Sequence, residues 1–411
     1  MKIAFGMIVF EGDYVLQQCL EQVYPYAEQI LIAEGPVKYW QDQGRTTSTD
    51  DTNKILDSFP DPDNKITIVH GQYSEKDEQC KAYMKHINDD IDYIWNLDSD
   101  EVYKSEDIEK IIKVLQEHKP TSVGVQSCSF YGGFTDYLTG FEQAEDNFLR
   151  IFKYEKGSTW LTHRPPTIQY ATNIVRKHMT STKLFELTCG AQMYHYSYVF
   201  PRQVKTKINY YKAKVSMNKC IDNYFENVYL PWVQGKNIEQ LYNGVHEFKP
   251  EYRGPCYTKP FEGTHPKAII RDMNQLTTIY NKQLKDDMKV TNMNSWKNKE
   301  VFDKQLKLNV KELNGSYPNH WLTNIELLLL ANPNSILDVG CGCGAFYEVC
   351  KRELPELKYF GIDYSSEAIE LATKTWGNHF EPLDYKELTK EYVSNYDVLY
   401  LSALLDVLPN G

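Results

Sequence analysis

Residues 95–103 read WNLDSDEVY and place the carboxylates of Asp98, Asp100 and Glu101 within four residues, directly after an apolar run. Like charges at this spacing repel one another, so the cluster either faces water or binds a cation. The preceding residues, DYIWNL at 92–97, have the apolar character of a buried strand. The charges therefore lie where a strand is expected to end.

The first 100 residues alternate apolar runs with helix-like segments. The runs are KIAFGMIVF at 2–10, QILIAEG at 29–35, KITIVHG at 65–71 and DYIWNLDSD at 92–100. This alternation predicts a largely parallel sheet with crossover helices. Ligands of such sheets bind outside the carboxyl ends of the strands. A binding site is therefore favoured over a solvated face for the carboxylate cluster.

The rest of the chain divides into three further regions. Aromatic runs at 120–200 indicate an antiparallel extension of the sheet, and helical patterns follow from 201 to about 285. The polar stretch KDDMKVTNMNSWKNKE at 285–300 is the best linker candidate, and strand–helix units then start again. We expect an α/β protein with one domain at 1–285, a linker at 286–310 and a second, doubly wound domain at 311–411.

The composition limits the partners and the compartment. The chain has 45 basic and 56 acidic residues, a formal charge of -11, which argues against a general nucleic-acid binder. Nine cysteines without a CxxC pair predict reduced thiols and a cytoplasmic protein. No apolar run is long enough to cross a bilayer, so we expect a soluble or at most peripheral protein. The oligomeric state is left open.

Five segments in order resemble glycosyltransferases of family 2, nucleotide-sugar-dependent enzymes with the GT-A fold. They are FGMIVFEGDYVLQQCLEQ, ILIAEG, STDDTNKIL, SEKDEQCKAYM and WNLDSDEVY, and the resemblance covers residues 1–200 and, more weakly, 201–285. It implies a nucleotide pocket that includes Glu34, Asp51 and Lys76. Asp51 could instead cap the helix that follows it, and Lys76 could be a solvated charge.

The Asp-x-Asp pattern suits a hard divalent cation, because carboxylate oxygens and the phosphates of a nucleotide together complete the shell of Mn²⁺ or Mg²⁺. We expect Asp98 and Asp100 to hold such an ion against the nucleotide-sugar. Many GT-A enzymes add a distal histidine, and His195 in MYHYSYV is the candidate third ligand. A packed, hydrogen-bonded histidine is the alternative.

An inverting glycosyl transfer also needs a base that takes the proton of the acceptor hydroxyl. The acidic pair in FEQAEDNFLRIFK is similar to one that family members carry after the Asp-x-Asp pattern, which implies Asp146 as the first candidate. Related enzymes use a Glu in a Trp…His-Glu segment, but here Trp160 is followed by His163 and Arg164. His163 is the second candidate, and a structural role stays open for both.

The second domain begins with ILDVGCGCGAF at 336–346, which places Gly340, Gly342 and Gly344 between a strand and a helix start. Glycines there let the backbone approach a ligand closely. Asp363 lies 19 residues after Gly344, at the end of the next expected strand, where it suits ribose hydroxyls. A dehydrogenase and a methyltransferase both fit these residues alone.

The order LDVGCGCG, GIDYS, LDY and DVLYLSALLDVL resembles class I S-adenosylmethionine-dependent methyltransferases over residues 320–411, and we prefer this reading to a dehydrogenase. The resemblance implies that Asp338 lies near the methionine amine, Asp363 on the ribose, Tyr364 beside the adenine and Asp384 near its amino group. Such domains normally continue through three more strands, so we expect this one to be incomplete at its C-terminus.

The resulting hypothesis is a metal-dependent, inverting glycosyltransferase that moves a sugar from a nucleotide-sugar to a glycan acceptor. Its second domain uses S-adenosylmethionine to methylate the glycan. Two alternatives stay open: a non-catalytic nucleotide- or glycan-binding protein, and a second domain that methylates a protein. The sequence does not name the donor sugar, the nucleotide, the acceptor or the linkage.

Overall fold

The structure is a computed structural model that describes residues 1–214, 217–295 and 299–401. It consists of two compact units, residues 1–284 and 285–411, which are described separately. No helix within the described ranges is both long enough and apolar enough to cross a membrane.

The first unit is built on a seven-stranded sheet with the strand order β12-β6-β9-β4-β1-β2-β3. Four consecutive strands of this sheet run parallel to one another: β1 (Ile3–Val9), β2 (Gln29–Glu34), β3 (Ile66–His70) and β4 (Tyr93–Asp98). One face of β1 packs with α1 (Leu16–Val23) and the other with α4 (Lys76–Met84), so every residue of β1 is buried. Strands covered on both faces read as continuous apolar runs, and the expected parallel sheet is present.

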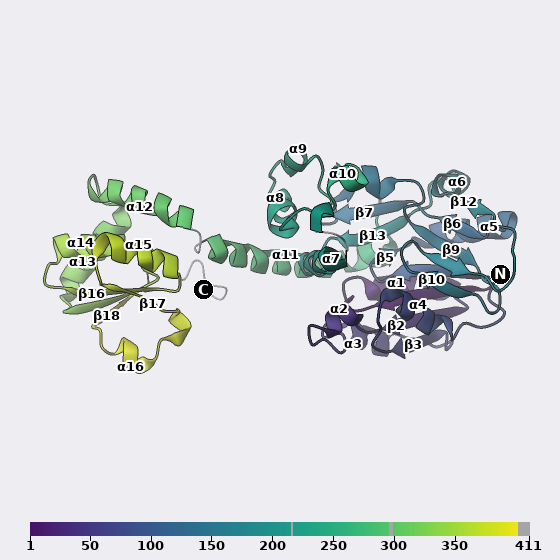
Figure 1. The fold of residues 1–411 in the computed structure, drawn as a ribbon, viewed down its shortest axis with the longest axis horizontal. Helices are drawn as coiled ribbons and strands as arrows, with labels where there is room; N and C mark the ends of the chain where they lie inside the picture. The colour runs from purple at the N-terminus through teal and green to yellow at the C-terminus, as the bar shows by residue number, and fades with distance from the viewer. Residues whose placement is uncertain (215–216, 296–298, 402–411) are drawn as a thin grey trace. The chain divides into compact units, whose positions relative to one another are not determined.

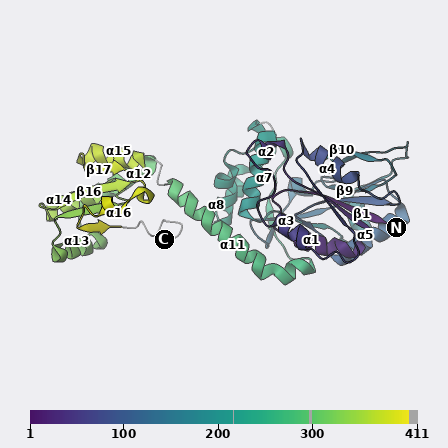
Figure 2. The ribbon, with the colours of Figure 1, turned by 90° about the horizontal axis from the view of Figure 1, so that it is seen from below.

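The remaining strands of the first unit complete the seven-stranded sheet and form two further sheets (Figures 1 and 2). The seven-stranded sheet is completed by β6 (Ser122–Gly124), β9 (Leu149–Lys153) and β12 (His178–Met179). A five-stranded sheet contains β5 (Glu101–Val102), β7 (Ser127–Tyr131), β8 (Asp136–Leu138), β13 (Met193–Tyr198) and β14 (Thr258–Pro260), and β10 (Thr159–Thr162) pairs with β11 (Thr167–Gln169). The expected antiparallel extension is only partly right, because β13 runs parallel to β7 and antiparallel to β5.

Helices and short turns connect these strands. They are α2 (Lys38–Gln41), α3 (Thr52–Ser58), α5 (Ser105–His118), α6 (Ser181–Leu187), α7 (Pro201–Lys214), α8 (Leu230–Val233), α9 (Ile238–Tyr242), α10 (Pro250–Arg253) and α11 (Lys267–Ser295), with the short turns η1 (Tyr24–Tyr26), η2 (Gly140–Gln143), η3 (Met217–Lys219) and η4 (Phe225–Tyr229). Helix α7 starts with Pro201, whose fixed φ suits a first helical position, and follows β13 after two residues. This short connection holds α7 against β13.

The second unit has a parallel four-stranded sheet with the order β17-β16-β15-β18. Its elements are α12 (Lys299–Leu313), α13 (Asn319–Ala331), β15 (Ser335–Val339), α14 (Ala345–Glu353), β16 (Lys358–Asp363), α15 (Ser366–Trp376), β17 (Phe380–Pro382), η5 (Tyr385–Glu387), α16 (Lys390–Val393) and β18 (Val398–Tyr400). This is the doubly wound arrangement that the sequence predicts, and the α/β fold class is confirmed for the chain. Residues 402–411, which hold most of the last expected motif, lie outside the described residues.

The segment expected to be a linker, 286–310, is helical where the structure describes it. It holds the end of α11 and most of α12, and Phe302 of α12 is buried. A polar segment with good helix formers can form a helix, because the helix provides the hydrogen bonds of its own backbone. Such a segment has a composition similar to that of a linker. The boundaries of the two domains stay a prediction.

Candidate active site

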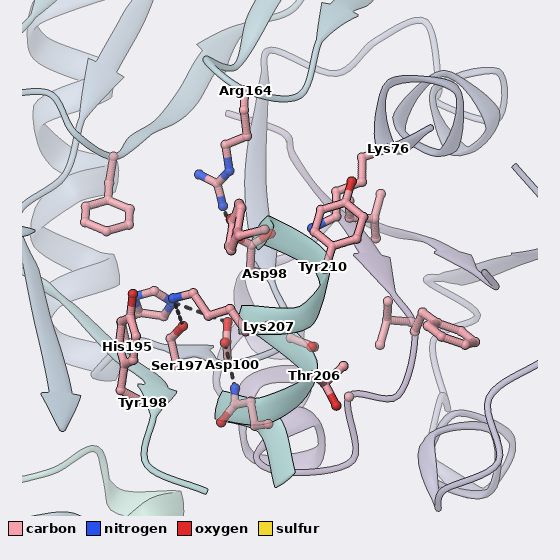
Figure 3. Close-up of a pocket in the computed structure, with 18 of the residues that line it drawn as sticks. Lys76, Asp98, Asp100, Arg164, His195, Ser197, Tyr198, Thr206, Lys207 and Tyr210 are labelled. Carbon is pink, nitrogen blue, oxygen red and sulfur yellow. Dashed lines mark hydrogen bonds and ion pairs between the residues drawn. The ribbon is translucent and has the colours of Figure 1, made fainter. Parts of the chain in front are cut away.

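A cavity of about 690 Å³ lies at the carboxyl ends of β1 and β4. Its walls include the loop after β1, the turn after β4, the start of α4, and residues of β13 and α7 (Figure 3). The acidic residues that line it are Glu11, Asp98, Asp100, Glu142, Asp146 and Glu247, and the basic ones are Lys76, Arg164, Lys207 and Arg253. This is the edge of a parallel sheet at which ligands bind.

Asp98 ends β4 and is paired with two arginines. Its Oδ2 atom accepts hydrogen bonds from Nη2 of Arg150, at 3.1 Å, and from Nη2 of Arg164, at 2.6 Å. Arg150 is fully buried and also donates to both carboxylate oxygens of Glu101, whose side chain is buried too. Burial alone would raise the pKa of Asp98, but the two guanidiniums hold it well below its ordinary value. Two of the three crowded carboxylates are thus balanced by arginines.

Asp100 faces a histidine rather than an arginine. Its Oδ2 atom accepts a hydrogen bond from Nε2 of Gln203 at 2.8 Å, and its Oδ1 atom lies 3.5 Å from Nε2 of His195. The Nδ1 atom of His195 is 3.1 Å from Oγ of Ser129, and that hydroxyl donates to Glu142 at 2.9 Å. The Ser129 hydroxyl gives its proton to Glu142, so the Nδ1–H group of His195 donates to Ser129, and the Nε2 atom of His195 faces the Asp100 carboxylate.

This pair fits a divalent cation. Two ligand atoms at about 2.1 Å from one octahedral ion are roughly 3 Å apart, close to the 3.5 Å between Asp100 and His195. The hydrogen bond from His195 Nδ1 to Ser129 is of the kind that orients metal-binding histidines. Asp98 fits less well because arginines occupy its Oδ2 atom. In the described part of the chain no three His, Cys, Asp or Glu residues are gathered to hold a metal ion, and the three-ligand set stays a prediction.

Lys76 reaches the cavity at the first position of α4. Its Nζ atom lies 4.6 Å from the ring centroid of Tyr210, and Figure 3 shows these two side chains next to each other. The rings of Tyr210 and Trp40 are stacked at 6.5 Å, and Phe10 follows Trp40 at 6.0 Å. All three rings line the cavity. An ammonium group beside flat aromatic rings suits a nucleotide, whose phosphates and base need both.

The other two residues expected beside the nucleotide are not among those that line the cavity. Glu34 is buried at the end of β2, where it accepts a hydrogen bond from the Ser48 backbone at 3.2 Å and lies 3.1 Å from His70. Asp51 is exposed at the start of α3 and lies 3.6 Å from Lys54. Glu34 therefore has the surroundings of a structural group, whereas Asp51 is a solvent-exposed charge that makes no capping hydrogen bond to α3.

Asp146 lines the cavity, but both of its carboxylate oxygens have partners. Oδ1 accepts a hydrogen bond from the Ser181 backbone at 2.9 Å, at the start of α6, and Oδ2 lies 2.7 Å from Nε2 of His178. Asp146 also has a left-handed backbone, with φ of 58°. Gly124 makes room for it, because a Cβ atom there would lie 2.1 Å from Asp146 Oδ1. These contacts give Asp146 a structural role at least.

His163 is buried and does not line the cavity. Its backbone N–H donates to Asp77 at 2.5 Å, and its Nδ1 atom is 3.5 Å from Sγ of Cys80. Burial, together with the positive charge of Arg164, holds the pKa of His163 well below its ordinary value. The structure therefore does not place the second candidate base on the wall of the cavity.

Several residues of the cavity were not predicted. Lys207 of α7 donates to Ser197 at 2.6 Å and lies over the Tyr198 ring at 3.6 Å. Glu142 and His246 are joined by a contact of 3.1 Å between Oε1 and Nε2, and Glu247 accepts a hydrogen bond from the Tyr198 hydroxyl. The dipeptide His-Glu at 246–247 follows Trp232, so the Trp…His-Glu signal was present, but farther along the chain than Trp160.

In the second unit the predicted residues lie at the carboxyl ends of β15 and β16, except for Asp384, which follows β17. Gly340, Gly342 and Gly344 all have positive φ, of 82°, 54° and 72°. Asp363 accepts a hydrogen bond from the Gly342 backbone at 3.0 Å, so the end of β16 touches the glycine loop. A Cβ atom at Gly344 would lie 2.5 Å from the Phe380 ring. Positive φ therefore favours glycine at all three positions, and close approach adds a second reason at Gly344.

Asp338 is buried at the end of β15. Its Oδ2 atom accepts a hydrogen bond from the Tyr359 hydroxyl, whereas its Oδ1 atom is buried without a hydrogen-bond partner. Burial raises the pKa of Asp338 to about 7 despite that hydrogen bond. An unpaired acceptor next to the glycine loop fits the ammonium group of a bound amino-acid moiety. Asp384 caps η5 through the Lys386 backbone at 3.0 Å, and Tyr364 directly follows Asp363.

We expect Asp338→Asn to flatten the pH dependence of stability of the second unit. The pKa of Asp338 is about 7 in the folded protein, against an ordinary value of 3.8. Its contribution to the free energy of unfolding is therefore complete below pH 3.8 and is lost as the pH rises through 7. Between pH 5 and 8 the parent should lose about 2 to 3 kcal/mol from this group. Hydrogen exchange of β15 peptides in urea measures it. Glu356→Gln, at an exposed carboxylate, is the control, and equal slopes for parent and Asp338→Asn would contradict the prediction.

Two family profiles match the chain. Residues 46–198 match the family described as Glycosyl transferase family 2, and residues 337–410 match a methyltransferase domain. The chain carries a glycosyl transferase family 2 domain and an S-adenosylmethionine-dependent methyltransferase domain, which confirms the two resemblances and excludes the dehydrogenase reading.

Individual relatives cover only parts of the chain. A demethylmenaquinone methyltransferase of Thermotoga maritima is 40% identical over 50 residues, 12% of this chain and 22% of that protein. The structure of S. aureus TarS 1-349 in complex with UDP covers 37% of this chain and 47% of its own, at 12% identity and a TM-score of 0.26. The plantazolicin methyltransferase BpumL covers 33% and 52%, at 26% identity and a TM-score of 0.24. The assignment of the two domains rests on the family profiles.

Proposed function

We propose that the first unit transfers a sugar from a nucleotide-sugar to a hydroxyl group of a glycan acceptor, with inversion and with the help of Mn²⁺ or Mg²⁺. The observation that carries this proposal is the pair of Asp100 and His195, whose Oδ1 and Nε2 atoms are 3.5 Å apart in a cavity that also contains Lys76 and stacked aromatic rings. Asp100 and His195 would hold the ion. When bound, it would stabilise negative charge on the departing diphosphate.

The residues of the chain supply the other requirements of this reaction. Lys76 and Arg164 place positive charge in the cavity, which favours a diphosphate leaving group. Trp40 and Tyr210 offer ring faces to a base. Arg164 also donates to Asp98, so it can hold the β4 end in place while it faces the substrate. Each group is placed by a different element, and the cavity therefore depends on the complete first unit.

The decisive experiment is a screen of nucleotide-sugars that differ in base and in sugar, with and without Mn²⁺. Thermal shift identifies the donor that binds, and turnover with glycan acceptors then separates an enzyme from a binding protein. Inversion is tested by proton NMR of the anomeric configuration in the product. Binding without hydrolysis or transfer for any donor would favour the non-catalytic alternative.

For the second unit we propose methylation of the glycan by S-adenosylmethionine. The unpaired Asp338 Oδ1 atom and the glycine loop that touches Asp363 support a site for this cofactor. Methyl transfer to the glycosylated product, compared with transfer to protein acceptors, separates this proposal from its alternative. We also propose a cytoplasmic location, because nine cysteines without a CxxC pair suit reduced thiols.

A further inference from the structure

A segment at residues 245–249 forms part of the cavity wall and is fixed in place. The Val245 carbonyl accepts hydrogen bonds from the hydroxyls of Tyr131, at 3.2 Å, and Tyr224, at 2.5 Å. The Glu247 carbonyl accepts one from the Ile221 backbone at 2.9 Å. His246 and Glu247 are 4% and 1% exposed, and both line the cavity. Their side chains are therefore held in place before any ligand binds.

One carboxylate oxygen of Glu247 lacks a hydrogen-bond partner. The other, Oε2, accepts the hydroxyl proton of Tyr198, while Oε1 is buried without a partner. His246 Nδ1 lies 3.2 Å from Oε2, but it accepts a hydrogen bond from the Phe248 backbone at 3.1 Å and so has no proton for Glu247 when His246 is neutral. An unsatisfied buried acceptor costs about 1 to 3 kcal/mol, a cost that a ligand hydroxyl would remove.

The other carboxylates of the cavity are already engaged. Asp98 is paired with two arginines, and Asp100 with Gln203 and His195, while both oxygens of Asp146 have partners. Glu11 accepts from Arg45 and from Thr49. Glu142 contacts Ser129 and His246, and, although burial opposes it, the hydrogen bond with His246 lowers the pKa of Glu142 to about 2. Among the cavity carboxylates that the structure describes, Glu247 is the one with a buried oxygen that lacks a hydrogen-bond partner.

A second group of aromatic residues lies beside Glu247. The Arg253 guanidinium is 5.3 Å from the Phe141 centroid and 5.4 Å from the Phe248 centroid, and all three residues line the cavity. The rings near Lys76 come from other elements, α2 and α7. The cavity therefore has aromatic surface for an acceptor sugar in addition to that for the base of the donor.

We propose that Glu247, rather than Asp146, is the general base of the glycosyl transfer, an inference that rests on the function proposed above. The acceptor O–H bond breaks and its proton moves to Glu247 Oε1. The acceptor oxygen forms a bond to the anomeric carbon, and the bond from that carbon to the diphosphate breaks, with its electron pair leaving on the nucleoside diphosphate. Tyr198, through its hydrogen bond to Oε2, is the positioning residue for this carboxylate.

The test compares Glu247→Gln with Asp146→Asn in the full chain, with a donor and acceptor on which the parent is active. Removal of a general base costs about 10²- to 10⁴-fold. Glu247→Gln should lower kcat for transfer at least 100-fold and leave the Kd of the nucleoside diphosphate with Mn²⁺ within about threefold. Asp146→Asn should lower kcat less. The proposal is overturned if Glu247→Gln has a kcat within about threefold of the parent's. It is also overturned if Asp146→Asn loses more of its kcat than Glu247→Gln does.

Glu247→Asp guards against a failure of folding. It keeps the carboxyl group but withdraws it by one methylene, so kcat should fall between those of the parent and Glu247→Gln, with an unchanged nucleotide Kd. If Glu247→Gln does not fold, a Glu247→Asp variant that folds and has the parent's kcat overturns the proposal. If the parent itself transfers no sugar from any donor, the proposed function fails, and the role of Glu247 fails with it. If the parent transfers sugar and only the variants lose this activity, the result bears on the assignment of the base and not on the proposed function.

The pH profile separates a base from a structural residue. In the parent, kcat should fall at low pH as the base becomes protonated, and Glu247→Gln should lose this acid limb. The titratable groups that interact with Glu247 are Tyr131, Tyr198, Cys220, Tyr224, His246 and Cys256. Glu142 and Lys207 contact two of these groups, His246 and Tyr198. Burial raises the pKa of each of the three tyrosines, which therefore remain neutral across the profile. His246→Gln should keep the acid limb, and its loss there would contradict the assignment to Glu247.

Discussion

Asp100→Asn is expected to weaken Mn²⁺-dependent binding of a nucleoside diphosphate by about 100-fold or more. The amide keeps an oxygen for the hydrogen bond from Gln203 but loses the charge that faces His195 Nε2. Because the change removes one of three like charges at 98–101, the fold should stay intact without the metal. Calorimetry with the diphosphate, at saturating Mn²⁺ and without it, measures the loss.

The matched control for this prediction is Asp57→Asn. Asp57 lies on the exposed surface of α3, so the same loss of charge should leave nucleotide binding unchanged. His195→Gln should reduce only the Mn²⁺-dependent part of the binding. If Asp100→Asn binds the diphosphate like the parent and shows the same response to Mn²⁺, the ion does not lie at Asp100, and the metal dependence of the proposed function is lost.

The parallel strands could be predicted because their whole surface is buried. All residues of β1 and β2 are covered, so both read as unbroken apolar runs. The pairing of β13 could not be predicted in the same way. Its aromatic alternation indicates a strand, but a local pattern does not set the partner, and Tyr194 pairs with Cys128 of β7 in a parallel register.

The residues of the site differ in the same way: the sequence predicts the placement of some of them but not of others. Asp98, Asp100 and Lys76 could be predicted because each lies in a short motif at a strand end or a helix start. Glu247 could not be assigned, since its segment is held at the cavity by hydrogen bonds to the Val245 carbonyl from Tyr131 of β7 and from Tyr224, which precedes η4. His163 has the right residue type near a suggestive Trp160, but β10 and α4 bury it.

Arg150 is a second residue whose importance the sequence hides. It lies between Leu149 and Ile151 in β9, where a charge in a strand usually indicates a solvent-facing position. In the structure its side chain is fully buried and donates to Glu101, to Asp98 and, at 3.2 Å, to the Leu149 carbonyl. One guanidinium thus joins β9 to the acidic end of β4.

Arg150→Met is therefore expected to destabilise the first unit by about 3 to 5 kcal/mol, because it leaves the buried Glu101 without its partner. Burial already raises the pKa of Glu101 even with Arg150 beside it. Without Arg150 that pKa rises further, so the loss of stability should be larger at pH 8 than at pH 5, where Glu101 takes up a proton. Hydrogen exchange of β4 peptides in the full chain measures the change.

Arg150→Met combined with Glu101→Gln removes the orphaned charge and should recover part of the stability at pH 8. An equal loss at both pH values, or no recovery in the double variant, would show that Arg150 acts by packing rather than by charge.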